Sequence, residues 1–354
     1  MLIKLVIKKG DIMFSKDIMA VNIGDSIIKI IVGNKSNIKF CESIKTPEES
    51  IVNGKVIELE IVALALRKFI NKNNINVKKI SFAINGQDIV IRQIETPIMK
   101  DKEIKKSVDW EMNQYLRDEG ENHYIDFEKV DTIVLEDKKT YKLLAVAAPR
   151  DKIDQLVELS NSLNMKLVSV DVLSNCIVRA FRNLGITSKE IESMAVIDMG
   201  YETTSIIILE SGKFFIERAV PFGLNNIAKE ICRKNGIDIE EAFNYIEEKY
   251  DINNLKDEDE TEKRIETLVE NVYSTFAKVI QFYTANNTKK AIDEIFLIGS
   301  GCKLKGMDKF TNNYFSIKTS LVDSPEMLNL NIKFPGDKDF KTFASTLGLL
   351  LRKE

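Results

Sequence analysis

Two glycine turns, each set between a pair of apolar strand-like runs, recur about half a chain apart. The first run spans Ala20–Val32 around Gly24, and the second spans Ala195–Leu209 around Gly200. In each copy an apolar strand leads into a glycine turn with hydroxyl side chains, and a second strand follows. A long internal repeat of this kind predicts a chain built from two related halves.

The two copies can be matched residue by residue. The matched positions are Asn22 with Asp198, Gly24 with Gly200, and Ser26 with Thr203 and Thr204. Glycine lets the backbone approach a ligand closely, and successive amides of a turn can converge on an anion such as phosphate. The Asp198 carboxylate could hold the water shell of Mg²⁺, which a neutral asparagine does poorly. The pair therefore predicts a site for a phosphorylated ligand.

A third glycine turn strengthens this prediction. The apolar strand that begins at Glu294 runs into Gly299-Ser300-Gly301, a turn suited to backing a purine ring. A single glycine turn between strands is more often only a β-hairpin. Three such turns in one chain instead indicate a nucleotide site.

Length and composition limit the class of protein. A chain of 354 residues exceeds what one core usually supports, so we expect two or more compact units. Strand-like runs alternate with helical periodicity, as in the helix predicted over Glu262–Ala285, and this alternation is typical of α/β proteins. The charged segment Lys256–Glu262 before that helix is interpreted as a solvated loop.

Charge and cysteine usage argue against two kinds of partner. The formal charge of −3 comes from 51 basic and 54 acidic residues mixed along the chain, so we expect no nucleic-acid partner. Four widely spaced cysteines and one histidine do not form a metal-binding pattern. We interpret the cysteines as buried thiols in a reducing compartment.

The sequence predicts a cytoplasmic protein. No apolar run approaches the roughly 18 residues of a membrane span, and the amino terminus lacks a secretory cleavage pattern. Met1–Gly10 alternates apolar and basic residues and could form a weak membrane-surface element. The favoured interpretation is that Met13 is the true start.

These turns resemble motifs of a known superfamily. The two hairpins are similar to the phosphate-one and phosphate-two motifs of the actin, sugar-kinase and heat-shock-chaperone superfamily, and the third turn is similar to its adenosine motif. The resemblance implies an α/β, actin-like (ribonuclease H-like) fold of two lobes, with ATP and Mg²⁺ as cofactors in the cleft between them. It implies ATP contacts from Asn22, Gly24, Ser26, Lys29, Gly200, Thr203, Thr204, Gly223, Gly299, Ser300 and Gly301, with Asp198 holding Mg²⁺ through water.

A narrower resemblance covers the chain from about Met13 to its end. Ile80–Pro97, Glu103–Tyr115 and Tyr124–Phe127 are interpreted as a hairpin, a helix and a strand, with Trp110 packed on the sheet. Together with Ala147–Arg150, Val170–Val172, Arg179–Phe181 and Phe214–Gly223, these segments closely resemble the PilM family of actin-like type IV pilus assembly proteins. That family is similar to the cell-division protein FtsA in carrying an extra subdomain, 1C. The terminus Phe343–Glu354 stops without FtsA's linker and amphipathic membrane helix.

The resemblance also implies a division into subdomains. Subdomain 1A is expected over residues 13–78 and 161–194, with 1C inserted at 79–160. Subdomain 2A is expected over 195–222 and 291–335, with 2B at 223–290. A carboxyl-terminal helix within 336–354 is expected to return to 1A.

The function implied by the resemblance is that of an adaptor. Proteins of this family bind the cytoplasmic amino-terminal tail of the inner-membrane protein PilN in a groove between 1A and 1C. They thereby couple the envelope machinery to the assembly ATPase PilB, and they reach the membrane only through their partner. The alternative is an active, FtsA-like ATPase in cell division or pilus assembly. A sugar or acetate kinase would need a catalytic carboxylate and a substrate lobe for which we find no sequence signal.

Several positions depart from the superfamily pattern. Asn22 stands where an acidic residue is usual, and Phe243 and Ile246 stand where relatives carry a glutamate and a lysine near the nucleoside. Ser300 replaces a glycine in the adenosine turn. Since phosphoryl transfer depends on positioned metal and charge, we expect ATP binding with weak or no hydrolysis.

Two residues keep alternative interpretations. Lys29 could be a phosphate ligand or a solvated strand lysine. Asp171 lies near the place where relatives carry a carboxylate that orients attacking water, and it could equally cap the helix that follows.

Overall fold

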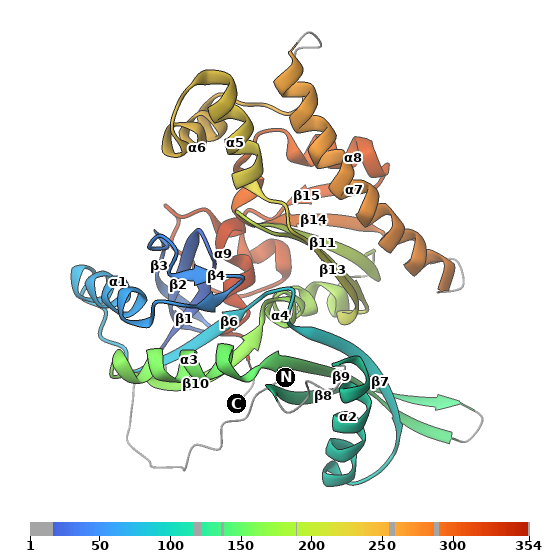
Figure 1. The fold of residues 1–354 in the computed structure, drawn as a ribbon. Coiled ribbons are helices and arrows are strands. Elements are labelled where there is room, and N and C mark those ends of the chain that lie inside the picture. Colours follow the sequence, from blue (N-terminus) through green and yellow to red (C-terminus); the bar gives the residue numbers. More distant parts are fainter. Residues whose placement is uncertain are drawn as a thin grey trace. The chain divides into compact units, whose positions relative to one another are not determined.

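The computed structural model describes residues 17–116, 122–135, 138–188, 190–254, 259–286 and 290–352. The chain divides into two compact units (Figure 1). One unit is Met1–Cys176 with Leu349–Glu354, and the other is Ile177–Gly348. The amino-terminal Met1–Gly10 and the possible start at Met13 lie outside the described residues, as does part of the charged segment 256–262.

The first unit is built on a five-stranded sheet. Its strands are β1 (Ile18–Ile23), β2 (Ile27–Asn34), β3 (Asn37–Lys45), β6 (Lys79–Ile84) and β10 (Lys166–Val172). Their order is β10-β6-β1-β2-β3; β1, β2 and β3 are antiparallel, while β6 and β10 run parallel to β1. Such buried strands form because the chain there is almost continuously apolar, as in Met19–Ile23.

Two helices and a small ribbon complete this part of the first unit. Helix α1 (Leu59–Lys72) buries its Val62, Ala63, Leu66 and Phe69 face, and α3 (Arg150–Ser162) buries Ile153, Leu156 and Leu159. These side chains belong to the same apolar core as the sheet, at the spacing of an amphipathic helix. The ribbon consists of β4 (Ile51–Val52) and β5 (Lys55–Val56).

A second sheet of the first unit follows β6 in the chain. Strands β7 (Val90–Pro97), β9 (Lys138–Pro149) and β8 (His123–Leu135) form an antiparallel sheet in that order, with α2 (Asp101–Tyr115) packed against it (Figure 1). The expected hairpin over Ile80–Pro97 is wrong, because β6 and β7 belong to different sheets. Strand β6 thus lies with β1 and not with the inserted sheet; the subdomain boundaries themselves stay a prediction.

The expectation that Trp110 packs on the sheet is also wrong, since its side chain is 70% exposed. Helix α2 buries Ile104, Val108 and Met112, which recur every four residues. Trp110 follows Val108 by two positions, roughly 200° around the helix, and therefore faces away from that stripe.

The second unit repeats the strand order of the first. Its sheet contains β11 (Ser193–Met199), β12 (Thr204–Glu210), β13 (Lys213–Val220), β14 (Glu294–Ile298) and β15 (Thr319–Leu321). The order β15-β14-β11-β12-β13, with β14 and β15 parallel to their neighbours, matches β10-β6-β1-β2-β3 strand for strand. The internal repeat seen in the sequence is therefore a repeat of the whole sheet.

Helices supply most of the remaining core of the second unit. They are α5 (Leu224–Asn235), α6 (Ile239–Glu248), α7 (Glu260–Asn286), α8 (Met307–Phe315) and α9 (Phe340–Leu347), while α4 (Leu173–Thr187) begins in the first unit. The helix predicted over Glu262–Ala285 is confirmed as α7, whose Tyr273, Phe276 and Tyr283 are buried. The 3₁₀ turns Ser300–Lys303 and Pro325–Leu328 connect the later elements.

The cysteines were expected to be buried thiols. Cys41, Cys176 and Cys302 are buried and Cys232 is half-buried, and all four are free thiols. Burial raises the pKa of the Cys176 thiol to about 12.

Within the described ranges, none of the helices is both long and apolar enough to cross a membrane.

Candidate functional site

The two predicted hairpins have the same turn geometry. In the first, Ile23 pairs with Ile28, and in the second Met199 pairs with Thr204, so each turn contains four residues. A Cβ at Gly24 would lie 2.8 Å from the carbonyl oxygen three residues later, and a Cβ at Gly200 would lie 2.9 Å from the equivalent oxygen. Neither position has room for a side chain, so both turns require glycine.

The strand register corrects one sequence match. Counting from the paired ends of the strands, Ser26 corresponds to Glu202, and Thr203 and Thr204 correspond to Ile27 and Ile28. The expected match of Ser26 with Thr203 and Thr204 is therefore wrong by one or two positions. The sequence match failed because it aligned hydroxyl groups, whereas the pairing of the strands fixes the turn.

The carboxyl end of β1 gathers three predicted residues in the first unit. Asn22 lies directly opposite Lys29 on β2, and on its other side it is in register with Ala83 of β6. Asp171 of β10 is in register with the same Ala83. All three polar residues are buried, with Lys29 only 6% exposed, so the interpretation of Lys29 as a solvated strand lysine is wrong.

Asp171 makes local contacts at the start of α4. Its Oδ1 atom accepts a hydrogen bond from the Val172 N–H at 2.9 Å and another from Asn175 Nδ2 at 3.1 Å. Both contacts lie at the junction of β10 and α4, and neither donor is a backbone N–H of the first turn of α4, so the capping interpretation also stays a prediction. The water-orienting role of Asp171 stays a prediction.

The corresponding edge of the second unit brings together the second and third turns. Asp198, the second-last residue of β11, is in register with Ile298, the last residue of β14, so Gly299 follows beside it. A Cβ at Gly299 would overlap Asp198 Oδ1, and one at Gly301 would overlap the Met199 side chain. Gly299 also has a φ of 95°, which favours glycine. Ser300 is buried beside them.

The two threonines of the second hairpin have different roles. Thr204 is buried, and its hydroxyl donates a hydrogen bond of 2.7 Å to the carbonyl of Phe222. Its proton is therefore used inside the protein. Thr203 is half-buried at the turn and is the better placed of the two to meet a ligand. Phosphate contacts from either threonine stay a prediction.

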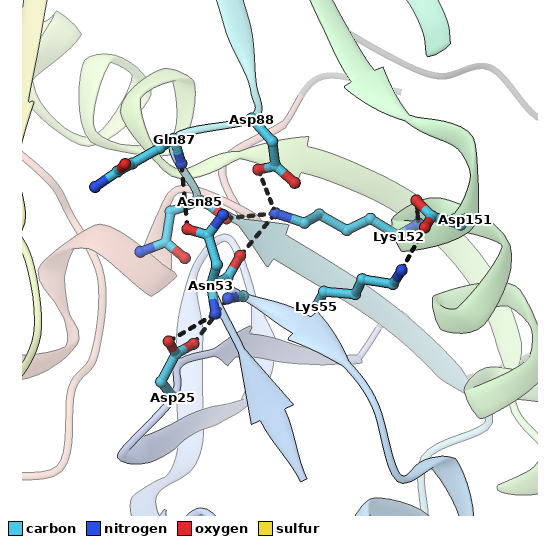
Figure 2. Close-up of polar contacts among 9 residues, drawn as sticks. Asp25, Asn53, Lys55, Asn85, Gln87, Asp88, Asp151 and Lys152 are labelled. Atoms are coloured by element: carbon cyan, nitrogen blue, oxygen red, sulfur yellow. Dashed lines mark hydrogen bonds and ion pairs between the residues drawn. The ribbon is translucent and has the colours of Figure 1, made fainter. Parts of the chain in front are cut away.

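Each hairpin tip carries a carboxylate that the sequence analysis overlooked. Asp25 accepts the backbone N–H groups of Asn53 and Gly54, both at 2.7 Å (Figure 2). Glu202 Oε1 accepts a hydrogen bond of 2.7 Å from Asn225 Nδ2. Both carboxylates are held by donors of neighbouring segments, and such hydrogen bonds favour the charged form of the acid. In the sequence, these acids could have been found by their positions, because Asp25 follows Gly24 directly and Glu202 follows Gly200 by two residues.

Different groups fasten the two turns. Thr46, after β3, donates its hydroxyl to Gly24 O at 2.7 Å, and its N–H bonds Ser26 O at 2.9 Å. In the second unit the start of α5 takes this place, since Leu224 N–H donates to Gly200 O at 3.0 Å. Gly223, the residue before α5, lies so close to the turn that a Cβ there would overlap the backbone of Tyr201. This contact explains why residue 223 is glycine; a direct ligand contact stays a prediction.

An aromatic pair lies next to the second hairpin where the superfamily has charged residues. Tyr201 packs edge-on against Phe243 with ring centroids 5.2 Å apart, whereas Ile246 is fully buried in the core. Glu247 pairs with Lys303 at 2.7 Å. Burial raises the pKa of the Tyr201 hydroxyl, opposed by Lys303 and reinforced by Glu247. Of the two positions that depart from the superfamily pattern, Phe243 thus packs on the hairpin and Ile246 belongs to the core; a nucleoside contact at either stays a prediction.

The donor set of the second unit fits a nucleotide phosphate with hydrated Mg²⁺. The Asp198 carboxylate, the Gly200 turn and the Gly299 turn share one edge of the sheet. Among the residues that the structure describes, no three histidine, cysteine, aspartate or glutamate side chains gather as a metal cluster. A single carboxylate suits Mg²⁺, which keeps several waters of its own.

Comparisons with known proteins agree with this fold. The family model of type IV pilus assembly protein PilM matches residues 20–353. A solved PilM-PilN type IV pilus biogenesis complex contains a chain that is similar to this one with a TM-score of 0.80 at 18% identity, over 94% of this chain and 97% of that chain.

Two further structures share the actin-like fold at lower similarity. The ethanolamine utilization protein EutJ from Carboxydothermus hydrogenoformans has a TM-score of 0.55 at 13% identity, covering 99% of this chain and 93% of its own. MreB5 of Spiroplasma citri, solved with ADP, has a TM-score of 0.53 at 10% identity, covering 95% of each chain. The expected actin-like fold is thus confirmed. The family match covers nearly the whole chain, and this chain belongs to the family of type IV pilus assembly protein PilM.

Proposed function

We propose that this protein is a cytoplasmic, actin-like adaptor of type IV pilus assembly that binds ATP and hydrolyses it weakly or not at all. The observation that carries this proposal is the inequality of the two hairpins. Asp198 stands at the end of β11, whereas Asn22 stands at the equivalent end of β1, directly opposite Lys29. One hairpin thus offers a carboxylate to Mg²⁺ and the other offers an amide and an ammonium group.

This imbalance supports binding more than turnover. The backbone amides of each glycine turn can bind phosphate oxygens without any proton transfer, aided by Lys29 at the first turn and by Thr203 at the second. Hydrolysis needs metal and charge placed on both sides of the transferred phosphoryl group. When bound, Mg–ATP would supply a multivalent anion that binds and orders the turns. Within the second unit, the Gly200 turn and Asp198 would orient that anion.

The proposed partner is the cytoplasmic amino-terminal tail of PilN. The similar chain of known structure was solved in a PilM-PilN complex, and the inserted β7-β9-β8 sheet offers strand edges of the kind that can add an extended peptide. Through that tail the adaptor would reach the membrane and link the envelope machinery to the assembly ATPase PilB.

A synthetic PilN tail peptide tests the proposal. We expect the labelled peptide to bind in fluorescence anisotropy titrations. Binding should be about fivefold tighter when Mg–ATP is present, because we expect nucleotide and peptide to favour the same conformation of the protein. A scrambled peptide of the same composition is the control. Absence of binding both with and without Mg–ATP would refute the adaptor.

A working ATPase is the second candidate, because the Asp198 hairpin keeps its acidic residue. A steady-state phosphate-release assay separates the two. ATP turnover well above the uncatalysed background in the wild-type protein would favour the ATPase, whereas background rates in the wild type with a gain in the Asn22→Asp variant would exclude it.

A further inference from the structure

The Lys152 side chain is completely buried at the start of α3. Burying an ammonium group costs several kcal/mol unless its charge is paired and its protons are donated to acceptors. Lys152 has no part in the ligand contacts described above. Its contacts therefore need a separate explanation.

The ammonium group joins three segments of the first unit (Figure 2). Lys152 Nζ donates to the carbonyl oxygen of Asn53 at 2.8 Å, to the carbonyl oxygen of Asn85 at 3.2 Å, and to Asp88 Oδ1 at 2.6 Å. An ammonium group has three protons, so all of them are used. Asn53 belongs to the β4–β5 turn, while Asn85 and Asp88 belong to the connection from β6 to β7.

The β4–β5 turn also contacts the first hairpin, and so links that hairpin to Lys152. Asn53 and Gly54 have φ values of 51° and 70°, as the central residues of a tight type I′ turn require. Their N–H groups point to the Asp25 carboxylate, while the Asn53 carbonyl accepts from Lys152. One peptide segment thus lies between the hairpin tip and the buried ammonium group.

The same contacts are closely packed. A Cβ at Gly54 would lie 2.5 Å from Asn85 O, and a Cβ at Gly86 would lie 2.5 Å from Lys152 Nζ. Asn53 Oδ1 also accepts the Gln87 N–H at 3.3 Å. Because these contacts join the turn directly to the β6–β7 connection, a shift of the turn would strain or break them.

We propose that Lys152 is a positioning residue that joins the first phosphate hairpin to the base of the inserted β7-β9-β8 sheet, so that a phosphate-bearing ligand at the hairpin is coupled to the order of β7. The proposal rests on the proposed function only in taking Mg–ATP as that ligand. It deepens that function, because it gives the inserted sheet a way to respond to the nucleotide.

Hydrogen exchange measured by mass spectrometry tests the coupling with ligand. In the wild-type protein we expect Mg–ATP to slow exchange in residues 24–27 and also in residues 85–97, by about fivefold or more. In Lys152→Met the slowing at 24–27 should remain and that at 85–97 should disappear, and in Asp88→Asn the slowing at 85–97 should be reduced. Asp88→Asn leaves the ammonium group its two carbonyl partners, so it guards against a folding defect in Lys152→Met. Slowing at 85–97 that persists undiminished in both variants would overturn the proposal.

Lys55→Met is the matched control. Lys55 of the same ribbon pairs with Asp151 of the same helix, and Asp151 does not lie on the path from Asp25 to Asp88. The slowing at residues 85–97 should survive in this variant. Its loss there would show that any change in this region breaks the response, and the specific role of Lys152 would be wrong.

A second arm without ligand separates failure of the inference from failure of the nucleotide site. Asp25→Asn should speed exchange in residues 85–97 by about fivefold in the wild-type background and have no such effect in the Lys152→Met background. An equal effect in both backgrounds, or none in either, would overturn the coupling. If Mg–ATP slows exchange nowhere in the wild type, the proposed nucleotide site is wrong and this arm alone decides the role of Lys152.

Discussion

The two hairpins share a backbone and differ in their chemistry. Each has a four-residue turn that begins with a glycine packed against the carbonyl three residues later, and each sits on the first strand of a sheet with the same strand order. At the strand end before the turn, however, one has Asn22 and the other has Asp198. Repetition of the fold has therefore not preserved the charge that Mg²⁺ chemistry needs.

The hairpins also differ in what holds them. Side chains fasten the first, through the Thr46 hydroxyl and the Asp25 carboxylate. In the second, Gly223 and the start of α5 lie against the turn, and the Glu202–Asn225 hydrogen bond adds to this packing. The first hairpin can therefore be loosened by removing polar groups, whereas the second is most sensitive to added volume.

The largest effect should come from Gly223→Ala. The new methyl group would overlap the Tyr201 backbone, which cannot move without displacing α5, so we expect a loss of about 3 kcal/mol in the free energy of unfolding. Urea denaturation measures this loss. Gly336→Ala is the control, because a Cβ there meets nothing within 4 Å and its stability should change by less than about 0.5 kcal/mol. Equal effects at the two positions would contradict the close packing of Gly223.

Asn22→Asp should make the two hairpins alike. The new carboxylate would stand opposite Lys29 and give the first hairpin an acidic partner of its own for hydrated Mg²⁺, so we expect Mg–ATP to bind about tenfold more tightly, or about 1.4 kcal/mol. Isothermal titration calorimetry provides the measurement, and Asn22→Ala tests whether the charge is responsible. A similar gain in both variants would show that side-chain size, not charge, limits the first hairpin.

Removing one hydroxyl from each hairpin should have a smaller effect. Thr46→Val and Thr204→Val each delete a hydrogen bond to a backbone carbonyl, at Gly24 and at Phe222, and should each lower the free energy of unfolding by about 1 kcal/mol. Thermal unfolding of the variants checks this value, and the serine variants at both positions should retain most of the stability. If Thr46→Val has no effect, side chains do not fasten the first hairpin.

The smallest effect concerns the ion pair beside the first hairpin. The hydrogen bond from Lys55 lowers the pKa of the Asp151 carboxyl group, aided by the Lys152 N–H. A lowered folded-state pKa stabilises the protein above the unfolded value of about 3.9, and the contribution is lost as the pH falls through the folded pKa. Lys55→Met should therefore cost less than about 1 kcal/mol at pH 7, since both side chains are partly exposed.

The pH series supplies the check on that pair. The stability difference between the wild type and Lys55→Met should be constant above about pH 5 and should shrink toward zero in more acidic solution. Urea unfolding midpoints of both proteins, measured from pH 7 into acidic solution, give this stability difference at each pH. A difference that grows as the pH falls would contradict the pairing of Lys55 with Asp151.

Local patterns in the sequence predicted the α/β class and the internal repeat, and the resemblance to a known superfamily predicted the actin-like fold. The paired runs around Gly24 and Gly200 predicted the internal repeat, and the apolar spacing over Glu262–Ala285 predicted α7. Contacts between distant segments could not be read in this way. Ile80–Pro97 looked like a hairpin because two strands follow one another, but nothing local shows that they join different sheets.

Side-chain environments were harder to predict than elements. Trp110 was expected to be packed because tryptophan is usually buried, yet the turn of α2 places it opposite the apolar stripe. The burial of Lys152 could not be predicted from the sequence. Its acceptors are two backbone carbonyls and one carboxylate, from residues 64 to 99 positions away in the chain. Asp25 could have been noticed, because an acid beside Gly24 in a phosphate-binding turn needs a partner.

Titration of ATP with and without Mg²⁺ into Asp198→Asn and Asn22→Ala tests the inequality of the hairpins most directly. Mg²⁺ should strengthen ATP binding to the wild-type protein and to Asn22→Ala by the same factor, because Asn22 carries no charge for the metal. That strengthening should disappear in Asp198→Asn. Mg²⁺ dependence that survives in Asp198→Asn, or that is lost in Asn22→Ala, would contradict the assignment of the metal to the second hairpin.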